Sequence, residues 1–333
     1  MADATLRNSK IAPYFQFTLC ALSLAFCLFL PGCYERKQTA ILNPDGSGKV
    51  YIETVVVVPS QGLPGQEKPN ALSYGRLVAA DLINLTRGVE AWSDLSISEV
   101  ENPPGRAGAG AGAGPARARI AATAYFKDMN DLQFDKLPLD FIWKRDASGA
   151  SLTIQRTRTA VKSSATLSDA DVNQLVARSK DDYQTQKQAL QTQLNAYAID
   201  MSFELPGEVT ASRIFERHDN TVSLTLDGKK AMQALDKFMT DDAALRATFK
   251  AGQDLPANDD LMLVSMYGHN GPVQALVKIA PDAKPAFDYR TEMRVAQLGQ
   301  SKMIQDAGVQ LLPKFTVLPP SSQPASRPAS RGR

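Results

Sequence analysis

Few side chains in this 333-residue sequence have the types and spacing that catalysis requires. Its two histidines, His218 and His269, both stand beside turn-forming residues, and neither belongs to a His-Glu-x-x-His zinc motif. The sequence also lacks a Gly-x-Ser-x-Gly nucleophile elbow and a phosphate-binding loop ending in Gly-Lys-Ser or Gly-Lys-Thr. We therefore interpret both histidines as surface residues in turns, and we predict no metal site and no cofactor.

The Asn-Pro-Asp-Gly-Ser-Gly segment at residues 43–48 comes nearest to a cation-binding loop. Its first, third and fifth residues carry the alternating side-chain oxygens of a calcium loop. Such a loop needs a bidentate acid at its twelfth position, but Thr54 stands there and Glu53 falls one residue short. Strand-like sequence follows where the exiting helix should begin, so a glycine-rich β-turn is favoured over a calcium site.

Three acidic residues, Asp128, Asp131 and Asp135, lie close enough in sequence to suggest the paired carboxylates of a hydrolase. Nothing in the sequence shows that their side chains converge. A hydrolase that uses clustered carboxylates is therefore the alternative hypothesis.

An aromatic group formed by Trp92, Tyr125 and Phe126 falls on two predicted strands. Aromatic side chains on a sheet can bind an acyl chain or the face of a sugar. The same residues more often fill a hydrophobic core, so core packing is the favoured interpretation.

The N-terminus has the organisation of a secretory signal peptide. Basic residues at Arg7 and Lys10 precede an uncharged apolar run at residues 15–30, which is shorter than the roughly 20 residues of a membrane-spanning helix. The run closes on Leu-Pro-Gly followed by Cys33, which resembles the lipobox of bacterial lipoproteins. That resemblance implies cleavage after Gly32 and lipid attachment at Cys33. An uncleaved or ordinarily cleaved signal with an incidental cysteine is the other interpretation.

Cysteine positions agree with acylation. Cys20 and Cys27 would be lost with the signal, and Cys33 is the third and last cysteine of the chain. The mature domain would have neither a disulfide nor a cysteine metal site, although it is exported. Several acyl chains of the palmitate type would anchor it stably. Tyr34 replaces the aspartate that often retains lipoproteins in the inner membrane, so we favour the outer membrane, with the domain facing the periplasm.

Composition argues against a nucleic-acid partner. The 37 basic residues nearly balance the 35 acidic residues, and the formal net charge is +2. No single-sign field therefore covers the chain, whereas nucleic-acid binding depends on one.

Hydrophobic periodicity predicts an α+β fold with a mainly antiparallel, twisted sheet and helices packed on one side. We expect strands at residues 41–58 (with a turn), 89–100, 116–127, 139–144, 151–156, 199–205, 221–226, 261–267 and 272–279. We expect helices at residues 71–86, 229–239 and 241–250. The Asn270-Gly271 pair predicts a tight turn between the last two strands.

The longest predicted helix runs from Ser168 to about Ala198, with a thin apolar stripe that includes Val172, Tyr183 and Tyr197. Its surface is rich in Gln, Lys and Asp. A helix lying across one face of the sheet is favoured over a helix that projects from the body or forms a seam with a partner.

Three motifs together resemble those of bacterial lipoproteins with an LppM-like domain, a family of envelope proteins. They are Asn-Pro-Asp-Gly-Ser-Gly-Lys-Val at residues 43–50, Gly-Val-Glu-Ala-Trp at 88–92 with Ala-Tyr-Phe-Lys-Asp at 124–128, and Phe-Glu-Leu-Pro-Gly-Glu-Val at 203–209. The resemblance implies an α+β fold at the envelope side of a membrane and no catalytic residues.

The resemblance covers residues 33–239, and the signal peptide and the composition of the C-terminal region divide the rest of the chain, which gives four parts. We predict a signal peptide at residues 1–32, an LppM-like domain at 33–239 interrupted by a Gly/Ala loop at 105–115, an α+β extension at 240–311, and a disordered Pro/Ser/Arg tail at 312–333. The expected function is that of a non-enzymatic, lipid-anchored envelope protein. It would bind the membrane through its acyl chains, and either bind a lipid or an envelope protein or serve structurally.

Overall fold

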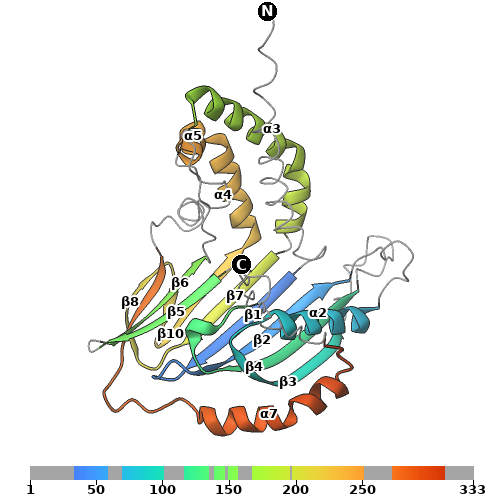
Figure 1. Cartoon of the computed structure of the whole chain (residues 1–333), viewed down its shortest axis with the longest axis vertical. Coiled ribbons are helices and arrows are strands. Elements are labelled where there is room, and N and C mark those ends of the chain that lie inside the picture. Colours follow the sequence, from blue (N-terminus) through green and yellow to red (C-terminus); the bar gives the residue numbers. More distant parts are fainter. Residues whose placement is uncertain are drawn as a thin grey trace, which may run out of the picture.

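The computed structural model describes residues 34–58, 70–100, 116–134, 139–146, 149–156, 167–195, 197–250 and 272–311. Over these residues the chain forms helices and two mostly antiparallel sheets, which confirms the predicted α+β class (Figure 1). The signal peptide with Cys33, the Gly/Ala loop, the predicted strand at 261–267 with its Asn-Gly turn, and the tail lie outside the described residues.

The larger sheet has seven strands in the order β3-β4-β2-β1-β7-β10-β9. They are β1 (Tyr34–Leu42), β2 (Gly48–Val57), β3 (Val89–Val100), β4 (Arg117–Phe126), β7 (Tyr197–Glu204), β9 (Glu216–His218) and β10 (Thr221–Asp227). Neighbouring strands are antiparallel except for β1 and β7, which run parallel with Tyr34 beside Tyr197. Parallel neighbours need a long crossover connection, and here it runs from the end of β1 at Leu42 to the start of β7 at Tyr197.

The smaller sheet has four strands in the order β5-β6-β11-β8. They are β5 (Leu139–Asp146), β6 (Gly149–Arg156), β8 (Glu208–Arg213) and β11 (Val273–Lys278), and all neighbouring pairs are antiparallel. The predicted hairpin of β5 and β6 is confirmed. Because β11 lies between β6 and β8, the segment after residue 240 shares a sheet with strands from the first part of the chain.

A common core joins one face of the larger sheet to the smaller sheet. Side chains alternate along each strand, so Ala40 and Leu42 of β1 are buried while Thr39 is exposed. Four phenylalanines cross this core in a row, with successive ring centroids 5.6, 5.9 and 5.9 Å apart: Phe134, Phe141, Phe203 and Phe215. Their edge-on and tilted contacts fill the space between the sheets.

Helix α2 (Ala71–Leu85) covers another part of the same face. Asn70 caps it by accepting a hydrogen bond from the amide of Ser73 at 2.7 Å. Tyr74 and Val78 of the helix pack in one buried cluster with Ile120 of β4. A short turn of 3₁₀ helix, η1 (Met129–Asp131), closes the core after β4.

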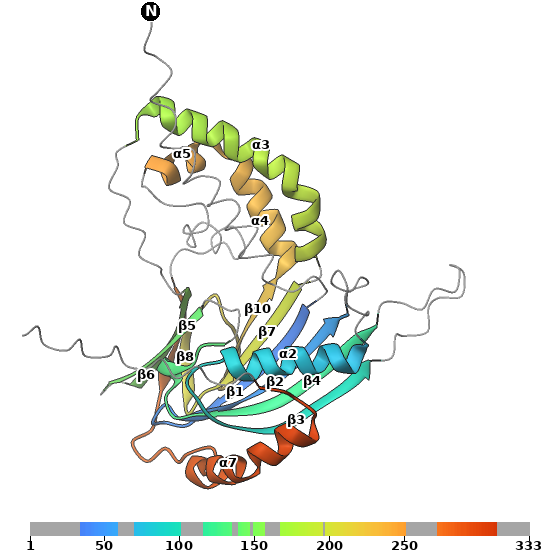
Figure 2. The same cartoon turned by 45° about the vertical axis from the view of Figure 1, so that its right-hand side comes forward.

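Helix α3 (Asp169–Leu194) does not lie across a sheet. It packs against α4 (Gly228–Thr240) and α5 (Asp242–Lys250), and the three helices share a separate cluster of buried residues. Figures 1 and 2 show this helical unit standing beyond one end of the sheets. The favoured interpretation of the long helix was therefore wrong, because its narrow apolar stripe is matched by two short amphipathic helices.

The long helix is also shorter than predicted. It ends at Leu194, and Tyr197 and Ala198 belong to β7 instead. There Tyr197 pairs with Tyr34 of β1 and Ala198 with Asp227 of β10, so sheet pairing on both sides outweighs the local helical pattern.

Helix α7 (Tyr289–Asp306) was not predicted. Its first half lies on the face of the larger sheet opposite to α2, where Ala296 packs with Ala91 and Tyr125 (Figure 2). Its end reaches past the edge strand β3 to α2, where Ile304 shares a buried cluster with Tyr74 and Val78. Its side chains also reach the edge strand: Gln300 accepts from the amide of Trp92 at 2.8 Å. The helices thus lie on both sides of this sheet, and α7 occupies a hydrogen-bonding position that an edge strand otherwise leaves open.

Candidate functional site

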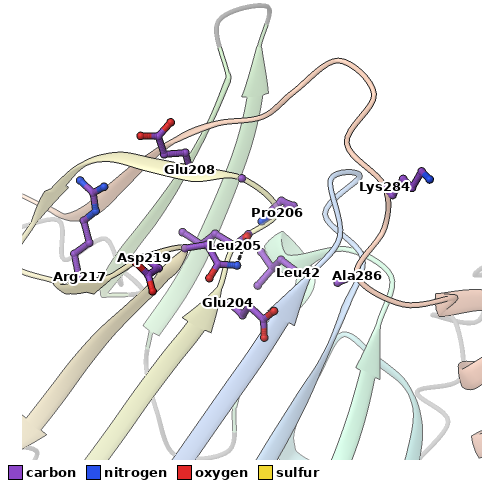
Figure 3. A pocket seen from close by; sticks show the side chains of 11 residues that line it. Leu42, Glu204, Leu205, Pro206, Glu208, Arg217, Asp219, Lys284 and Ala286 are labelled. Carbon is purple, nitrogen blue, oxygen red and sulfur yellow. Dashed lines mark hydrogen bonds between the residues drawn. The ribbon is translucent and has the colours of Figure 1, made fainter.

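A pocket of about 510 Å³ opens at the end of the sheets where β1 and β7 finish (Figure 3). It is lined by Leu42, Glu204, Leu205, Pro206, Gly207, Glu208, Arg217, Asp219, Asn220, Lys284 and Ala286. These residues come from the end of β1, the turn between β7 and β8, the β9–β10 hairpin and the segment that precedes α7.

Backbone hydrogen bonds hold the two turns of the pocket together. The amide of Leu205 donates to the carbonyl of Asn220 at 2.9 Å, and the Asn220 side chain donates to the Leu205 carbonyl at 3.2 Å. Asp219 has a φ of 53°, a left-handed conformation that aspartate tolerates in tight turns. The turn chemistry therefore positions the polar rim of the pocket.

The lining combines three carboxylates with two cations, and Figure 3 shows Glu208, Arg217 and Lys284 on separate sides of the opening. Among the described residues, the lining includes no serine, threonine, cysteine or histidine, and its charged groups are carboxylates, a lysine and an arginine. This arrangement can bind polar groups of either charge.

The prediction that the histidines are surface residues beside turns is confirmed for His218, the one of the two that the structure describes. His218 lies at the end of β9 with its side chain 91% exposed, and its Nδ1 is 3.3 Å from a carboxylate oxygen of Asp219. His269 lies outside the described residues. Among the residues that are described, no group of three or more His, Cys, Asp or Glu side chains could hold a metal ion.

The segment at residues 43–48 forms a turn and not an open cation loop. Asp45 accepts hydrogen bonds from the amide of Ser47 at 3.0 Å and from its hydroxyl at 2.7 Å. Asn43 bonds to the segment before α7, since its side-chain oxygen accepts from the amide of Ala286 at 2.9 Å. The side-chain oxygens of Asn43 and Asp45 thus accept hydrogen bonds from protein groups, and the segment has the glycine-rich β-turn that the favoured interpretation predicted.

The three aspartates of the hydrolase hypothesis are only partly visible. Asp128 caps η1 and accepts from the backbone and side-chain amides of Asn130 at 2.9 and 2.7 Å. Asp131 ends the same short helix and is exposed. Asp135 lies outside the described residues. What is seen of Asp128 is a helix-capping role.

The aromatic group is divided between the two faces of the larger sheet. Trp92 and Phe126 point into the core between the layers, whereas Tyr125 points to the opposite face under α7. All three are at least nine-tenths buried. Core packing, the favoured interpretation, is the arrangement observed.

Sequence reasoning missed a polar stretch on the buried face of β1, formed by Arg36, Gln38 and, from β2, Thr54. Arg36 is only 1% exposed, and its Nε donates to the Thr54 hydroxyl at 3.2 Å. A buried guanidinium is costly unless it is well satisfied. The alternation of Arg36 and Gln38 with exposed Glu35 and Lys37 was the available signal, but polar residues on both faces do not resemble a strand.

No helix in the described part of the chain combines the length and apolarity needed to cross a membrane. The described part of the molecule is an α+β body with two sheets, a protruding helical unit and a polar pocket. No family model matches the chain, and no curated protein matches it either.

Among solved structures, the NMR structure of the folded domain of LppM from Mycobacterium tuberculosis is similar to this chain. The two share 11% sequence identity with a TM-score of 0.29, over 78% of this chain and 98% of that chain. At this identity and TM-score the resemblance between the two structures is weak.

Proposed function

We propose that this chain is an exported lipoprotein, held at a membrane of the cell envelope by acyl chains on Cys33. Its folded part is non-enzymatic and binds a ligand or partner or serves structurally. The supporting observation is the start of β1 at Tyr34, the residue after Cys33. Every described strand and helix lies beyond the proposed cleavage site, so removal of residues 1–32 would leave all of these elements in the chain.

The described carboxyl groups with a displaced pKa are unsuited to general acid catalysis. Four aspartates have a pKa displaced below the ordinary range: Asp169, Asp236, Asp242 and Asp288. A carboxylic acid that donates a proton near neutral pH needs the opposite displacement. No specific observation favours the hydrolase alternative.

We place the protein at the outer membrane, facing the periplasm, where the cell has two membranes. Tyr34 after the acylated cysteine is the reason, because it does not match the retention signal expected for the inner membrane. Its membrane contact would be the acyl chains, which anchor stably when two or more are present.

Acylation is tested by expressing the full chain and its Cys33→Ala variant in a bacterial host fed an alkyne-bearing palmitate analogue. The wild type should incorporate the label and fractionate with membranes, whereas Cys33→Ala should lose the label. Cys27→Ala is the matched control, and it should label normally. A cleaved Cys33→Ala protein that stays in the membrane fraction would contradict the anchor.

Ligand or partner binding is tested by purifying the mature chain from its native envelope and identifying co-purifying lipids and proteins by mass spectrometry. A lipid recovered in stoichiometric amount, or a defined protein, would support binding. A clean and unliganded monomer would contradict ligand or partner binding, and a structural role would be the remaining explanation.

A further inference from the structure

The outward face of α7 carries the most exposed large apolar side chain of the described residues. Leu298 is 80% exposed, and Val295, one turn earlier on the helix, is 66% exposed. Figures 1 and 2 show α7 at the margin of the molecule, and its C-terminal end meets α2, where the Arg76 side chain donates to the Ala307 carbonyl at 3.2 Å.

Leu298 does not contribute to the fold. Helix α7 packs through Ala296 and Ile304, which are 6% and 8% exposed. Successive residues of a helix are about 100° apart, so Leu298 lies nearly opposite Ala296. Leu298 and Val295 together form a small exposed apolar patch on the outward face of the helix.

The same outward face is cationic. Arg290, Arg294 and Lys302 are exposed, and no ion pair joins any of them to another described residue. Of the two acids in the helix, Glu292 is turned toward the sheet, where it binds Lys49 at 2.7 Å, and exposed Asp306 is the last residue, beyond Lys302. Leu298 is thus placed between Arg294 and Lys302, four residues away on either side.

These charges argue against a second copy of the chain as the occupant of this face. Two α7 helices packed antiparallel about Leu298 would place Arg294 of one copy opposite Lys302 of the other. Like charges at such positions are destabilising.

We propose that the outward face of α7 binds the surface of an anionic lipid bilayer. A helix that presents basic residues around an exposed apolar side chain can place that side chain at the acyl boundary while the cations meet the headgroups. The sequence after α7 adds to the attraction, because residues 312–333 contain Lys314, Arg327, Arg331 and Arg333 and no acid. The proposal does not depend on acylation of Cys33.

The test uses the chain from Tyr34 to Arg333, which lacks the acylation site and contains every described residue. Its partitioning is measured by co-sedimentation with phosphatidylcholine vesicles and with vesicles in which about a third of that lipid is replaced by phosphatidylglycerol. We expect binding to the anionic vesicles only. Each neutralised cation should weaken partitioning about fivefold, so the double variant Arg294→Gln/Lys302→Gln should lose about 25-fold.

Leu298→Asp should also weaken binding. Leu77→Asp is the matched control, since Leu77 is a 58% exposed leucine on α2 and should leave binding unchanged. A chain truncated after Leu311 separates the helix from the tail. Circular dichroism of each variant verifies that the fold is retained.

Three results would overturn the proposal. The first is a wild type that does not prefer anionic vesicles, and the second is equal binding by the Leu298→Asp and Leu77→Asp variants. The third is a truncated chain that no longer binds, combined with α7 variants that bind as well as the wild type. These vesicle measurements do not depend on the palmitate labelling of Cys33. Failure of the proposal for α7 can therefore be distinguished from failure of the proposed lipid anchor.

Discussion

Lys49 of β2 and Glu292 of α7 form an ion pair of 2.7 Å across the outer face of the larger sheet. The Lys49 ammonium also lies 4.3 Å from the centre of the Phe287 ring, and the Tyr125 hydroxyl donates to Glu292 at 3.3 Å. Burial acts to lower the pKa of Lys49, but its hydrogen bonds, first that to Glu292, outweigh burial and raise this pKa above its ordinary value. This contact fastens the C-terminal helix to the sheet.

Replacing Glu292 with alanine should lower the free energy of unfolding by about 1–3 kcal/mol, because the largely buried Lys49 ammonium would lose its acceptor. The control is Glu53→Ala, which removes an exposed pair with Arg119 at 3.6 Å and should cost less than about 1 kcal/mol. Urea unfolding measures both. Equal losses would show that the Lys49 pair behaves as an ordinary surface ion pair.

The raised pKa of Lys49 also predicts the alkaline dependence of stability. Its contribution should be fully present below the unfolded value of about 10.5 and should be lost as pH rises through the higher folded value. Unfolding of the wild type and of Lys49→Met, compared from neutral pH to above this range, should therefore show the stability difference narrowing. A difference that stays constant would contradict the assignment.

The helical unit should loosen in acid. Lys250 pairs with Asp169 at 2.7 Å, Lys187 pairs with Asp236 at 2.6 Å, and Lys180 pairs with Asp242. The lysine pairings lower the pKa of Asp169 and of Asp242. At Asp236 burial raises the pKa, but the hydrogen bonds from Lys187 and Tyr183 outweigh burial, so the pKa lies below its ordinary value. Stability from such groups is present above the unfolded pKa and is lost as pH falls through the folded one.

Hydrogen exchange along α3 should therefore accelerate as pH falls below about 4, after correction for the intrinsic exchange rate. A variant with all three aspartates changed to asparagine should lose this dependence. If the wild type and the variant respond alike, the three pairs do not hold the unit together.

Gly299 offers a stabilising substitution on α7. A Cβ built at this helical position meets no atom within 4 Å. Gly299→Ala should therefore raise the free energy of unfolding by about 0.5–1 kcal/mol, because alanine restricts the unfolded chain and favours the helix. Gly228→Ala is the contrasting variant, since its Cβ would collide with the Leu194 carbonyl, and it should destabilise. Thermal unfolding distinguishes the two directions.

The phenylalanine row should carry much of the stability between the sheets. Phe141 is 1% exposed and contacts the rings of Phe134 and Phe203. Phe141→Ala should cost about 3–5 kcal/mol, from lost burial and the remaining cavity. Leu276→Ala, on the exposed side of β11, should cost far less. Similar urea midpoints for the two variants would mean that the layers are not joined through this row.

The sequence predicted the strands and helices that are specified by turn residues or by the spacing of apolar residues along the chain. The Asn-Pro-Asp-Gly turn and the alternation after it predicted the β1–β2 hairpin, and apolar spacing predicted α2 and α4 to within a residue or two. The start of β1 was missed because Arg36 and Gln38, although buried, are polar. Helix α7 was missed because polar residues such as Gln300 form part of its contact with the sheet.

The sequence by itself determined the α+β class, most strand and helix positions, and the burial of Trp92, Tyr125 and Phe126. Only the tertiary structure decided that Trp92 shares a core with Phe126, that β1 pairs in parallel with β7, that β11 enters a second sheet, and that α3 packs on α4 and α5. Periodicity reports which side chains must leave water, since it depends on neighbours along the chain. The surface that buries them is chosen by contacts between distant segments, where many pairings satisfy the same local pattern and only complete packing distinguishes them.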